Sequence, residues 1–197
     1  MEYTYHYNSP LGDITLASNG EALTGLWFEG QKYYAAALSD EHEEKYLPIF
    51  RQTARWLDIY FGGKAPDFTP PLSFGSASHF RKNVWDILLT IPYGGTMTYK
   101  DIAELAAERM GKQSMSAQAA GGAVGHNPIS VIVPCHRIIG SDGSLTGYAG
   151  GIERKISLLR LEGADIQLPL SFFDENCVVN RCDPINEKMP KIGYKVL

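Results

Sequence analysis

The amino-acid sequence predicts an α+β protein with an N-terminal α/β domain and a C-terminal helical domain. The chain begins with the residue alternation of β-strands, whereas the three- and four-residue spacing of helices dominates its second half. A stretch rich in proline and glycine, residues 64–76, lies between these two parts. We therefore expect domains at residues 1–75 and 76–163, followed by a tail at residues 164–197.

The composition is that of a globular protein. The chain has 197 residues, 44% of them hydrophobic, which is enough to form a core in one ordinary domain or two small ones. It begins without a basic segment followed by an apolar run, and no run approaches the roughly 20 apolar residues of a membrane span. Three cysteines do not make a disulfide framework, so we expect a reducing, cytoplasmic location.

The charge distribution argues against nucleic-acid binding by bulk charge. The formal net charge is −4 and the pI is near 5.7. Residues 76–163 are the only part with a positive balance, with 9 Lys and Arg against 7 Asp and Glu. This slight excess could meet phosphate, but it does not by itself predict a nucleic-acid partner.

The first domain is expected to hold three strands and a helix. Residues 3–7 alternate Tyr with Thr or His, the period of a strand. Two further strands, residues 14–17 and 23–28, flank the turn residues 18–21 and predict a hairpin. Apolar residues spaced by three and four between residues 47 and 61 predict an amphipathic helix, which Gly62 and Gly63 end.

The second domain is expected to hold helices with clear capping residues. One helix starts at Ser78, and the sequence from Thr98 to Asp101 fits a capping box for the next helix. Ser116 caps a short helix over residues 117–124. The last two helices have the outline of a helix-turn-helix, although residues 109–115 make a longer connection than usual, and an ordinary helical pair is the alternative.

The short helix at residues 117–124 consists mostly of alanine and glycine. Gly121 and Gly122 each cost a helix about 1 kcal/mol, so a compensating role is expected. Small side chains allow a close approach of the backbone, either to a packed helix or to a narrow groove. The sequence alone leaves both alternatives open.

A cysteine and a histidine stand side by side after the β-branched run at residues 130–133, which we expect to be a strand. A neighbouring base lowers the pKa of a thiol and makes Cys135 a candidate nucleophile with His136 as its base. Adjacent residues on a strand point to opposite faces, so the pair can cooperate only if the chain turns at Pro134. A buried structural cysteine is the alternative.

Two features downstream bear on this pair. Residues 147–151 form a glycine-rich loop that lacks the strand and helix context of a dinucleotide or phosphate fingerprint. Glu162 ends a helix over residues 153–163, where the helix dipole disfavours a carboxylate. It either orients an imidazole or lies exposed on the surface.

Three segments resemble one protein family. Residues 132–140 (IVPCHRIIG), Asn127-Pro128 and residues 147–151 (GYAGG) are similar to the methylated-DNA–protein-cysteine methyltransferases, or O6-alkylguanine-DNA alkyltransferases. The resemblance runs from about Ser9 to Gly163. It implies a ribonuclease H-like N-terminal domain and a C-terminal domain with a helix-turn-helix and the active site. It also implies a monomer that needs no cofactor and acts on double-stranded DNA containing O6-alkylguanine.

The resemblance implies a single-turnover alkyl transfer after nucleotide flipping, from O6-alkylguanine and also O4-alkylthymine, to Cys135. His136 would act through a water as base, and Glu162 would hold its tautomer. Asn127 would stabilise the hinge between the recognition helix and the active site. Tyr99 would lie at the entrance and help to protonate the departing guanine.

The resemblance also implies a DNA-binding set and a pocket. The DNA-binding set comprises Ala117, Gln118, Ala119, Gly121, Gly122 and Arg137, and the pocket is lined by Val133, Ile138, Gly147, Tyr148 and Ala149. Gln118 stands where many members have an arginine that fills the gap left by the flipped nucleotide. Arg109 and Lys112 are expected to compensate for the missing charge.

Two other functions compete with alkyl transfer. One is a non-catalytic protein that binds alkylguanine and flags damage, but those relatives lack the acceptor cysteine that Cys135 provides. The other is a helix-turn-helix regulator without chemistry. In the tail, Cys177 and Cys182 are spaced more widely than the usual zinc pair, so no metal site is expected.

Overall fold

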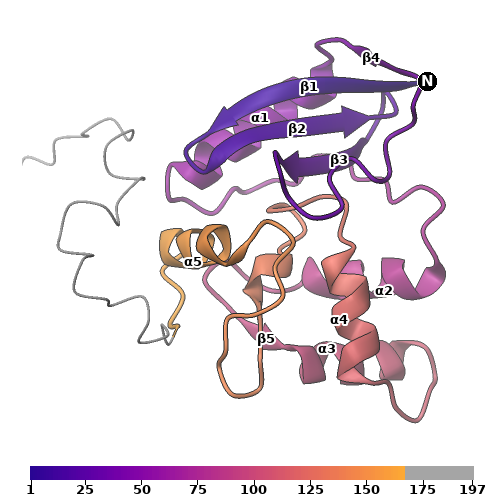
Figure 1. Ribbon diagram of the computed structural model, residues 1–197, viewed down its shortest axis with the longest axis vertical. Coiled ribbons are helices and arrows are strands. Elements are labelled where there is room, and N and C mark those ends of the chain that lie inside the picture. The colour runs from indigo at the N-terminus through magenta and orange to yellow at the C-terminus, as the bar shows by residue number, and fades with distance from the viewer. Residues whose placement is uncertain (167–197) are drawn as a thin grey trace, which may run out of the picture.

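A computed structural model describes residues 1–166, and its N-terminal part is a four-stranded sheet (Figure 1). The strands are β1 (Glu2–Ser9), β2 (Gly12–Ser18), β3 (Leu23–Phe28) and β4 (His42–Glu44), in the order β3-β2-β1-β4. β2 is antiparallel to both β1 and β3, and its pairing with β3 confirms the predicted hairpin, while β4 runs parallel to β1. β4 was not predicted, because its three residues are all exposed and show no alternation.

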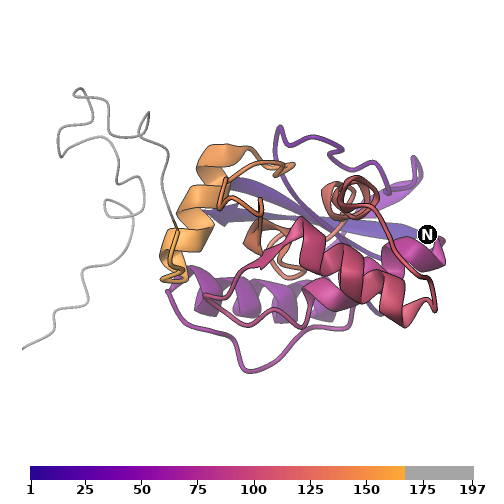
Figure 2. The same ribbon diagram turned by 90° about the horizontal axis from the view of Figure 1, so that it is seen from below.

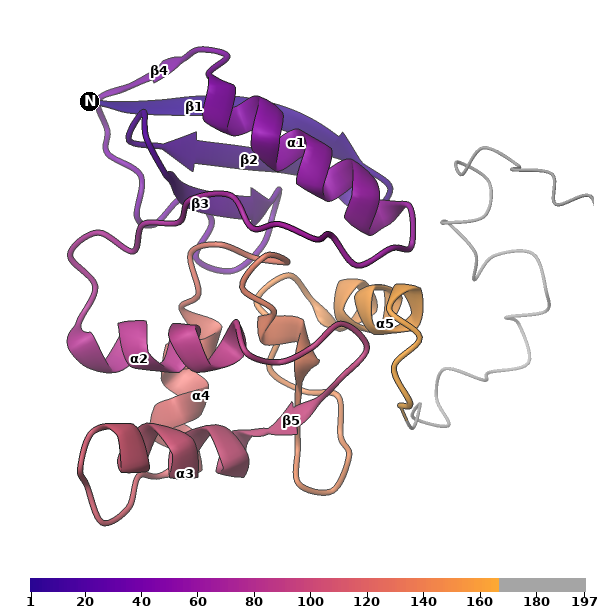
Figure 3. The same cartoon turned by 180° about the vertical axis from the view of Figure 1, so that it is seen from behind.

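Helix α1 (Pro48–Phe61) lies across one face of this sheet (Figure 3). Its spacing of apolar residues confirms the predicted amphipathic helix, because Phe50, Leu57 and Phe61 are all buried. Gly62 and Gly63 follow its end, and Gly63 has a φ of +75°, a conformation that favours glycine.

The C-terminal part is mostly helical and lies below the sheet in Figure 1 and in front of it in Figure 2. Its helices are α2 (His79–Leu88), α3 (Tyr99–Arg109), α4 (Ala117–Gly125) and α5 (Ile152–Leu161). The three predicted caps are confirmed. The side chains of Ser78 and Ser116 accept hydrogen bonds from backbone N–H groups, and Thr98 forms a complete capping box with Asp101.

The segment between α4 and α5 differs from the prediction. The run at residues 130–133 forms turns and not a strand, and Val131 has a φ of +68°, which is strained for a β-branched residue. The chain then forms a 3-10 turn, η1 (Cys135–Arg137), and a short strand, β6 (Ile138–Ile139), which pairs in parallel with β5 (Met97–Thr98). The chain therefore does turn after Pro134, which is the condition set above for any cooperation between Cys135 and His136.

The two parts of the chain share one core. Buried apolar residues of the sheet, α1, α2 and α4 belong to a single cluster that includes Cys135. Backbone hydrogen bonds join β3 to the segment before the cysteine, from Leu26 to Pro128 and from Ser130 to Leu26. Arg154 on α5 also donates to the carbonyls of Leu11 and Glu29. In the described part of the chain, no helix is long and apolar enough to span a membrane.

Candidate active site

Cys135 and His136 are both buried on the η1 turn. Their side chains project from a tight turn instead of from opposite faces of a strand, and only 5% of Cys135 and none of His136 is exposed. The Asn127 amide nitrogen lies 3.1 Å from the cysteine sulfur and 2.8 Å from the Val133 carbonyl oxygen. The Asn127 side-chain oxygen accepts from the Ile129 N–H at 3.0 Å, so this one side chain holds the segment that leads into the cysteine.

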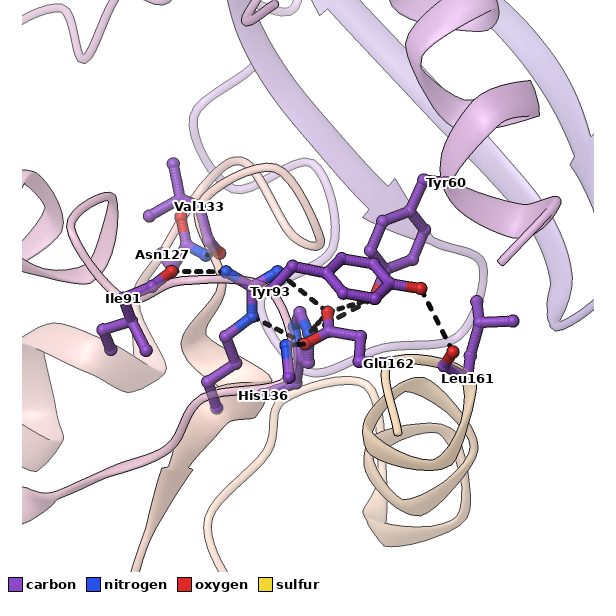
Figure 4. Close-up of polar contacts among 10 residues, drawn as sticks. Tyr60, Ile91, Tyr93, Asn127, Val133, His136, Leu161 and Glu162 are labelled. Carbon is purple, nitrogen blue, oxygen red and sulfur yellow. Dashed lines mark hydrogen bonds and ion pairs between the residues drawn. The ribbon is translucent and has the colours of Figure 1, made fainter. Parts of the chain in front are cut away.

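The carboxylate of Glu162 collects hydrogen bonds from four other residues, and we call these five residues the Glu162 network. Oε1 accepts from the Tyr60 hydroxyl at 2.6 Å, from His136 Nε2 at 2.7 Å and from Arg137 Nη2 at 2.9 Å. Oε2 accepts from Arg137 Nε at 2.8 Å and from the Gly94 N–H at 3.1 Å. The donors come from α1, the α2–β5 loop and η1, and Figure 4 shows Tyr60 and His136 converging on Glu162.

These contacts explain how a carboxylate can stand at the C-terminal end of α5, where the helix dipole disfavours a negative charge. Its side chain is buried, so the alternative of an exposed surface residue is wrong. Burial alone would raise the pKa of its carboxyl, but the hydrogen bonds from His136 and Arg137 and the charge of Arg137 hold the pKa well below its usual value. Glu162 is therefore ionised and oriented before any substrate arrives.

The same network fixes the protonation of the histidine. Burial lowers the pKa of His136, against the opposing effect of the Glu162 charge, so the imidazole is neutral near pH 7. Its Nε2 donates to Glu162, which leaves the Nδ1 lone pair free to accept a proton. Nδ1 is buried, with no hydrogen-bond partner among residues 1–166.

The thiol is protonated at rest. Burial raises the pKa of Cys135, while the hydrogen bond from Asn127 and the nearby charge of Lys155 act in the opposite direction. A base must therefore take the thiol proton at the moment of reaction. Neutral His136, on the adjacent position of the turn, is suited to that step.

The glycine-rich loop lies beside Tyr99. The Tyr99 hydroxyl donates to the Thr146 carbonyl at 3.1 Å, and a Cβ at Gly147, whose φ is +76°, would collide with that hydroxyl. Gly147, Tyr148 and Ala149 line a cavity of about 300 Å³ together with residues of α4. The other two expected pocket residues, Val133 and Ile138, are fully buried in the core and do not line this cavity.

One side of α4 presents a smooth surface to solvent. Ala117, Gln118, Ala119 and Gly122 are exposed. A Cβ added at Gly122 would meet no atom within 4 Å, and one at Gly121 would make ordinary contact with the Tyr99 ring. Packing within the described residues therefore does not explain the glycine at position 122.

The expectation that Arg137 contacts DNA does not fit the structure. Its guanidinium donates to both carboxylate oxygens of Glu162, and Nη1 donates to the Ile91 carbonyl at 2.6 Å. Only 9% of the side chain is exposed. A buried arginine whose donors are already paired with a carboxylate has little to offer a phosphate.

Sequence reasoning missed Tyr60 and Lys155. Tyr60 belongs to the buried face of α1, and its place in a helical apolar pattern concealed the role of its hydroxyl. The Lys155 ammonium is buried and donates to the Thr146 carbonyl at 2.7 Å and to the Ile138 carbonyl. Burial lowers its pKa to about 8, while the neighbouring Cys135 raises it.

Comparison with known proteins places this geometry in a family. Residues 1–74 match the ribonuclease-like domain of 6-O-methylguanine DNA methyltransferase, and residues 79–164 match its DNA-binding domain. A methylated-DNA–protein-cysteine methyltransferase of Mycobacterium tuberculosis is 42% identical over 86% of this chain and 99% of its own. One of Methanosarcina barkeri is 45% identical over 78% of this chain and 92% of its own.

A solved structure agrees with these matches. The structure of Mycobacterium tuberculosis OGT in complex with DNA superposes with a TM-score of 0.71 at 42% identity, and the match covers 82% of this chain and 93% of that one. Since family models match nearly all of residues 1–164 and relatives above 40% identity cover most of the chain, the protein belongs to the methylated-DNA–protein-cysteine methyltransferase family.

Proposed function

We propose that this protein repairs DNA by moving the alkyl group of O6-alkylguanine onto Cys135, once per molecule. The observation that carries the proposal is a buried thiol beside a neutral histidine whose tautomer is fixed by Glu162. The activity named for the family relatives supports it.

The reaction follows from these side chains. His136 Nδ1 takes the thiol proton through a bridging water, and the sulfur attacks the alkyl carbon in line with the C–O6 bond. The S–C bond forms as the C–O6 bond breaks. The electron pair of the C–O6 bond leaves with the guanine, which takes up a proton with the help of Tyr99. The product thioether has no easy leaving group, so Cys135 is consumed.

The DNA-binding element is proposed to be a helix-turn-helix formed by α3 and α4. α4 enters the minor groove, which is only about 6 Å wide, so its Ala and Gly surface suits a close approach. The alkylated nucleotide is flipped into the pocket, and Gln118 occupies the space it leaves. The exposed positions of Gln118 and Gly122 support this orientation.

The exposed Arg109, at the end of α3, and the exposed Lys112, in the connection to α4, are proposed to supply the phosphate contacts that Gln118 lacks. Replacing both with alanine should weaken duplex binding and flatten its dependence on salt, because each lost phosphate contact removes about one unit of the slope. Unchanged binding across a salt titration would contradict this assignment.

One incubation tests the main proposal. The protein is mixed with a duplex that carries O6-methylguanine, and its intact mass is measured with peptide mapping. We expect a gain of one CH₂ unit, about 14 Da, on Cys135, and no gain in Cys135→Ser. The same duplex with unmodified guanine is the control. Tight binding without any gain would instead support the second candidate, a protein that only flags alkylguanine.

O4-alkylthymine is a second substrate, testable in the same assay with O4-methylthymine in the duplex.

The domains are residues 1–75 and 76–163, a division that the family-model matches at 1–74 and 79–164 support. The tail at residues 164–197, with Cys177 and Cys182, lies outside the described residues from residue 167 on. A cytoplasmic location suits a reactive free thiol.

A further inference from the structure

The cavity beside the glycine-rich loop is not formed by the C-terminal part alone. Its volume is about 300 Å³, and its walls come from Gly121, Gly122, Gly125 and His126 of the α4 region, from residues 147–149, and from Lys32 and Tyr33. The last two belong to the loop between β3 and β4, residues 29–41, which we call the β3–β4 loop. The N-terminal part thus contributes one wall of the proposed substrate site.

Three of the contacts that hold the β3–β4 loop in place lie close to the site or to the sheet. The Lys32 N–H donates to the Ala149 carbonyl at 2.9 Å, which joins it to the glycine-rich loop. The Gln31 side-chain oxygen accepts from the Ser130 hydroxyl at 3.3 Å, next to the segment that leads to the cysteine. The Tyr34 hydroxyl is hydrogen-bonded to Thr15 Oγ1 on the sheet at 2.7 Å.

Within this loop, the Tyr33 ring stacks on His126. The ring centroids are 4.2 Å apart with an angle of 23° between the planes, and the Lys32 ammonium lies over the same ring at 4.8 Å. His126 itself is fixed, because its Nδ1 is 2.7 Å from the Gly122 carbonyl oxygen of α4. Tyr33 has a φ of +61°, an uncommon backbone conformation that the surrounding contacts must maintain.

This stacked pair lies between two hollows. Tyr33 and His126 also line a larger cleft of about 730 Å³, whose other lining residues include Trp27, Phe74 and Trp85. Asn127 borders that cleft too, and its amide contacts the Cys135 sulfur. The cleft therefore reaches to within one side chain of the acceptor, and it is lined by aromatic rings. Among the aromatic side chains that line the smaller cavity and the larger cleft, only those of Tyr33 and His126 border both.

We propose that Tyr33 is a specificity-determining residue that limits the size of the O6 substituent. In this proposal a methyl group on the reacting carbon stays short of the Tyr33–His126 pair, whereas an aryl group extending from that carbon past Asn127 would meet the pair. Removal of the Tyr33 ring joins the two hollows and gives the aryl group an aromatic cleft to occupy. This inference rests on the alkyl-transfer function proposed above and names the feature that sets its substrate range.

The test compares two substrates in one duplex sequence, one carrying O6-methylguanine and the other O6-benzylguanine. Rate constants for alkylation of Cys135 are measured by intact mass. Effects on DNA binding affect both substrates, so the benzyl-to-methyl ratio isolates the pocket. We expect Tyr33→Ala to raise this ratio about tenfold, in the range that a few carbon atoms contribute in an apolar pocket. Tyr33→Phe, which keeps the ring, should keep the low ratio.

Two further variants distinguish the loss of the Tyr33 ring as a barrier from a general loosening of the β3–β4 loop. Tyr34→Ala removes a neighbouring ring of equal exposure that lines neither hollow, and it should leave the ratio unchanged. Gly125→Ala adds a methyl group at the floor of the smaller cavity, where a Cβ meets no atom within 4 Å, and it should lower the ratio. Melting temperatures establish that each variant folds.

The outcomes are distinct. A ratio that stays within about twofold of the starting protein in folded Tyr33→Ala, or that rises equally in Tyr34→Ala, overturns the specificity role while the methyl transfer itself stands. If the unaltered protein gains no mass from either duplex, the proposed function fails and the inference fails with it.

Discussion

The Glu162 network and the exposed face of α4 are opposite kinds of site. In the network, all described polar atoms of one carboxylate are paired with donors from four other residues, and the group is buried. On α4, the side chains are small, exposed and without partners that would require a glycine. The network is thus complete within the protein, whereas the exposed face of α4, which we propose to bind DNA, has no partner among the described residues that would account for Gly122.

The largest effect is expected from removing the charge of Glu162. Glu162→Gln leaves the Arg137 guanidinium buried without its anion and should lower the free energy of unfolding by about 3–5 kcal/mol. It also loosens the His136 tautomer, so alkyl transfer should fall by about 100-fold or more. Thermal or urea unfolding and single-turnover rates measure the two effects.

Glu104→Gln is the matched control. Glu104 pairs with Lys100 at 3.7 Å on the surface of α3, with both side chains largely exposed, and such pairs contribute little. If Glu162→Gln were no more destabilising than Glu104→Gln, the network would not be the internal support described here.

A smaller loss is expected when only one donor is removed from the network. Tyr60→Phe deletes a hydroxyl that donates to a buried carboxylate and should cost about 1.5–3 kcal/mol. Tyr7→Phe is a fair comparison, because the Tyr7 hydroxyl also donates to a carboxylate, that of Asp58 at 2.8 Å, but at an exposed site. Urea unfolding of the two variants should rank Tyr60→Phe as the less stable; the reverse order would argue against a special role of burial.

The network should also make stability depend on pH. The pKa of His136 is lower in the folded protein, so its contribution is complete above its unfolded pKa of about 6.5 and is lost as the pH falls toward the folded value. Glu162, whose folded pKa is also lowered, adds a second loss below about pH 4.5. The free energy of unfolding should therefore fall between pH 7 and 5, and His136→Gln should flatten that decline. An equally steep decline in His136→Gln would assign it to other groups.

The smallest stability effect is expected on α4. Gly122→Ala fits without a clash and should stabilise the helix by up to about 1 kcal/mol, yet it should weaken binding to duplex DNA because the added methyl group faces the groove. Gly147→Ala should instead destabilise the protein, because its φ is positive and its Cβ would collide with Tyr99. Calorimetry and a duplex titration separate the two responses, and unaltered DNA affinity in Gly122→Ala would remove α4 from the interface.

Sequence patterns correctly predicted those elements that depend on interactions between residues close together in the chain. The hairpin, α1 and the caps at Ser78, Thr98 and Ser116 depend on neighbouring residues, and the structure confirms them. Glu162 was identified by its poor fit to a helix end. The strand expected at residues 130–133 was wrong, since backbone bonds to Leu26 and the strained Val131 bend that segment into turns.

Long-range partners could not be predicted from spacing. Tyr60 and Glu162 are 102 positions apart, and nothing near either residue signals the other. Arg137 was expected to contact DNA because of the family resemblance, but its guanidinium is paired with a buried carboxylate 25 positions further along the chain. The resemblance to a family supplied the role of Cys135, while the geometry of this chain supplied the reason why its histidine is neutral.

The Glu162 network joins residues 60, 94, 136, 137 and 162, so the order in which they are synthesised matters. A ribosome adds residues from the N-terminus, so the thiol at position 135 is made 27 residues before the carboxylate that orients its histidine. Until residue 162 has left the ribosome, the nascent chain carries Cys135 and His136 without the carboxylate that accepts a hydrogen bond from the imidazole. The network can therefore close only when nearly all of the described chain has been made.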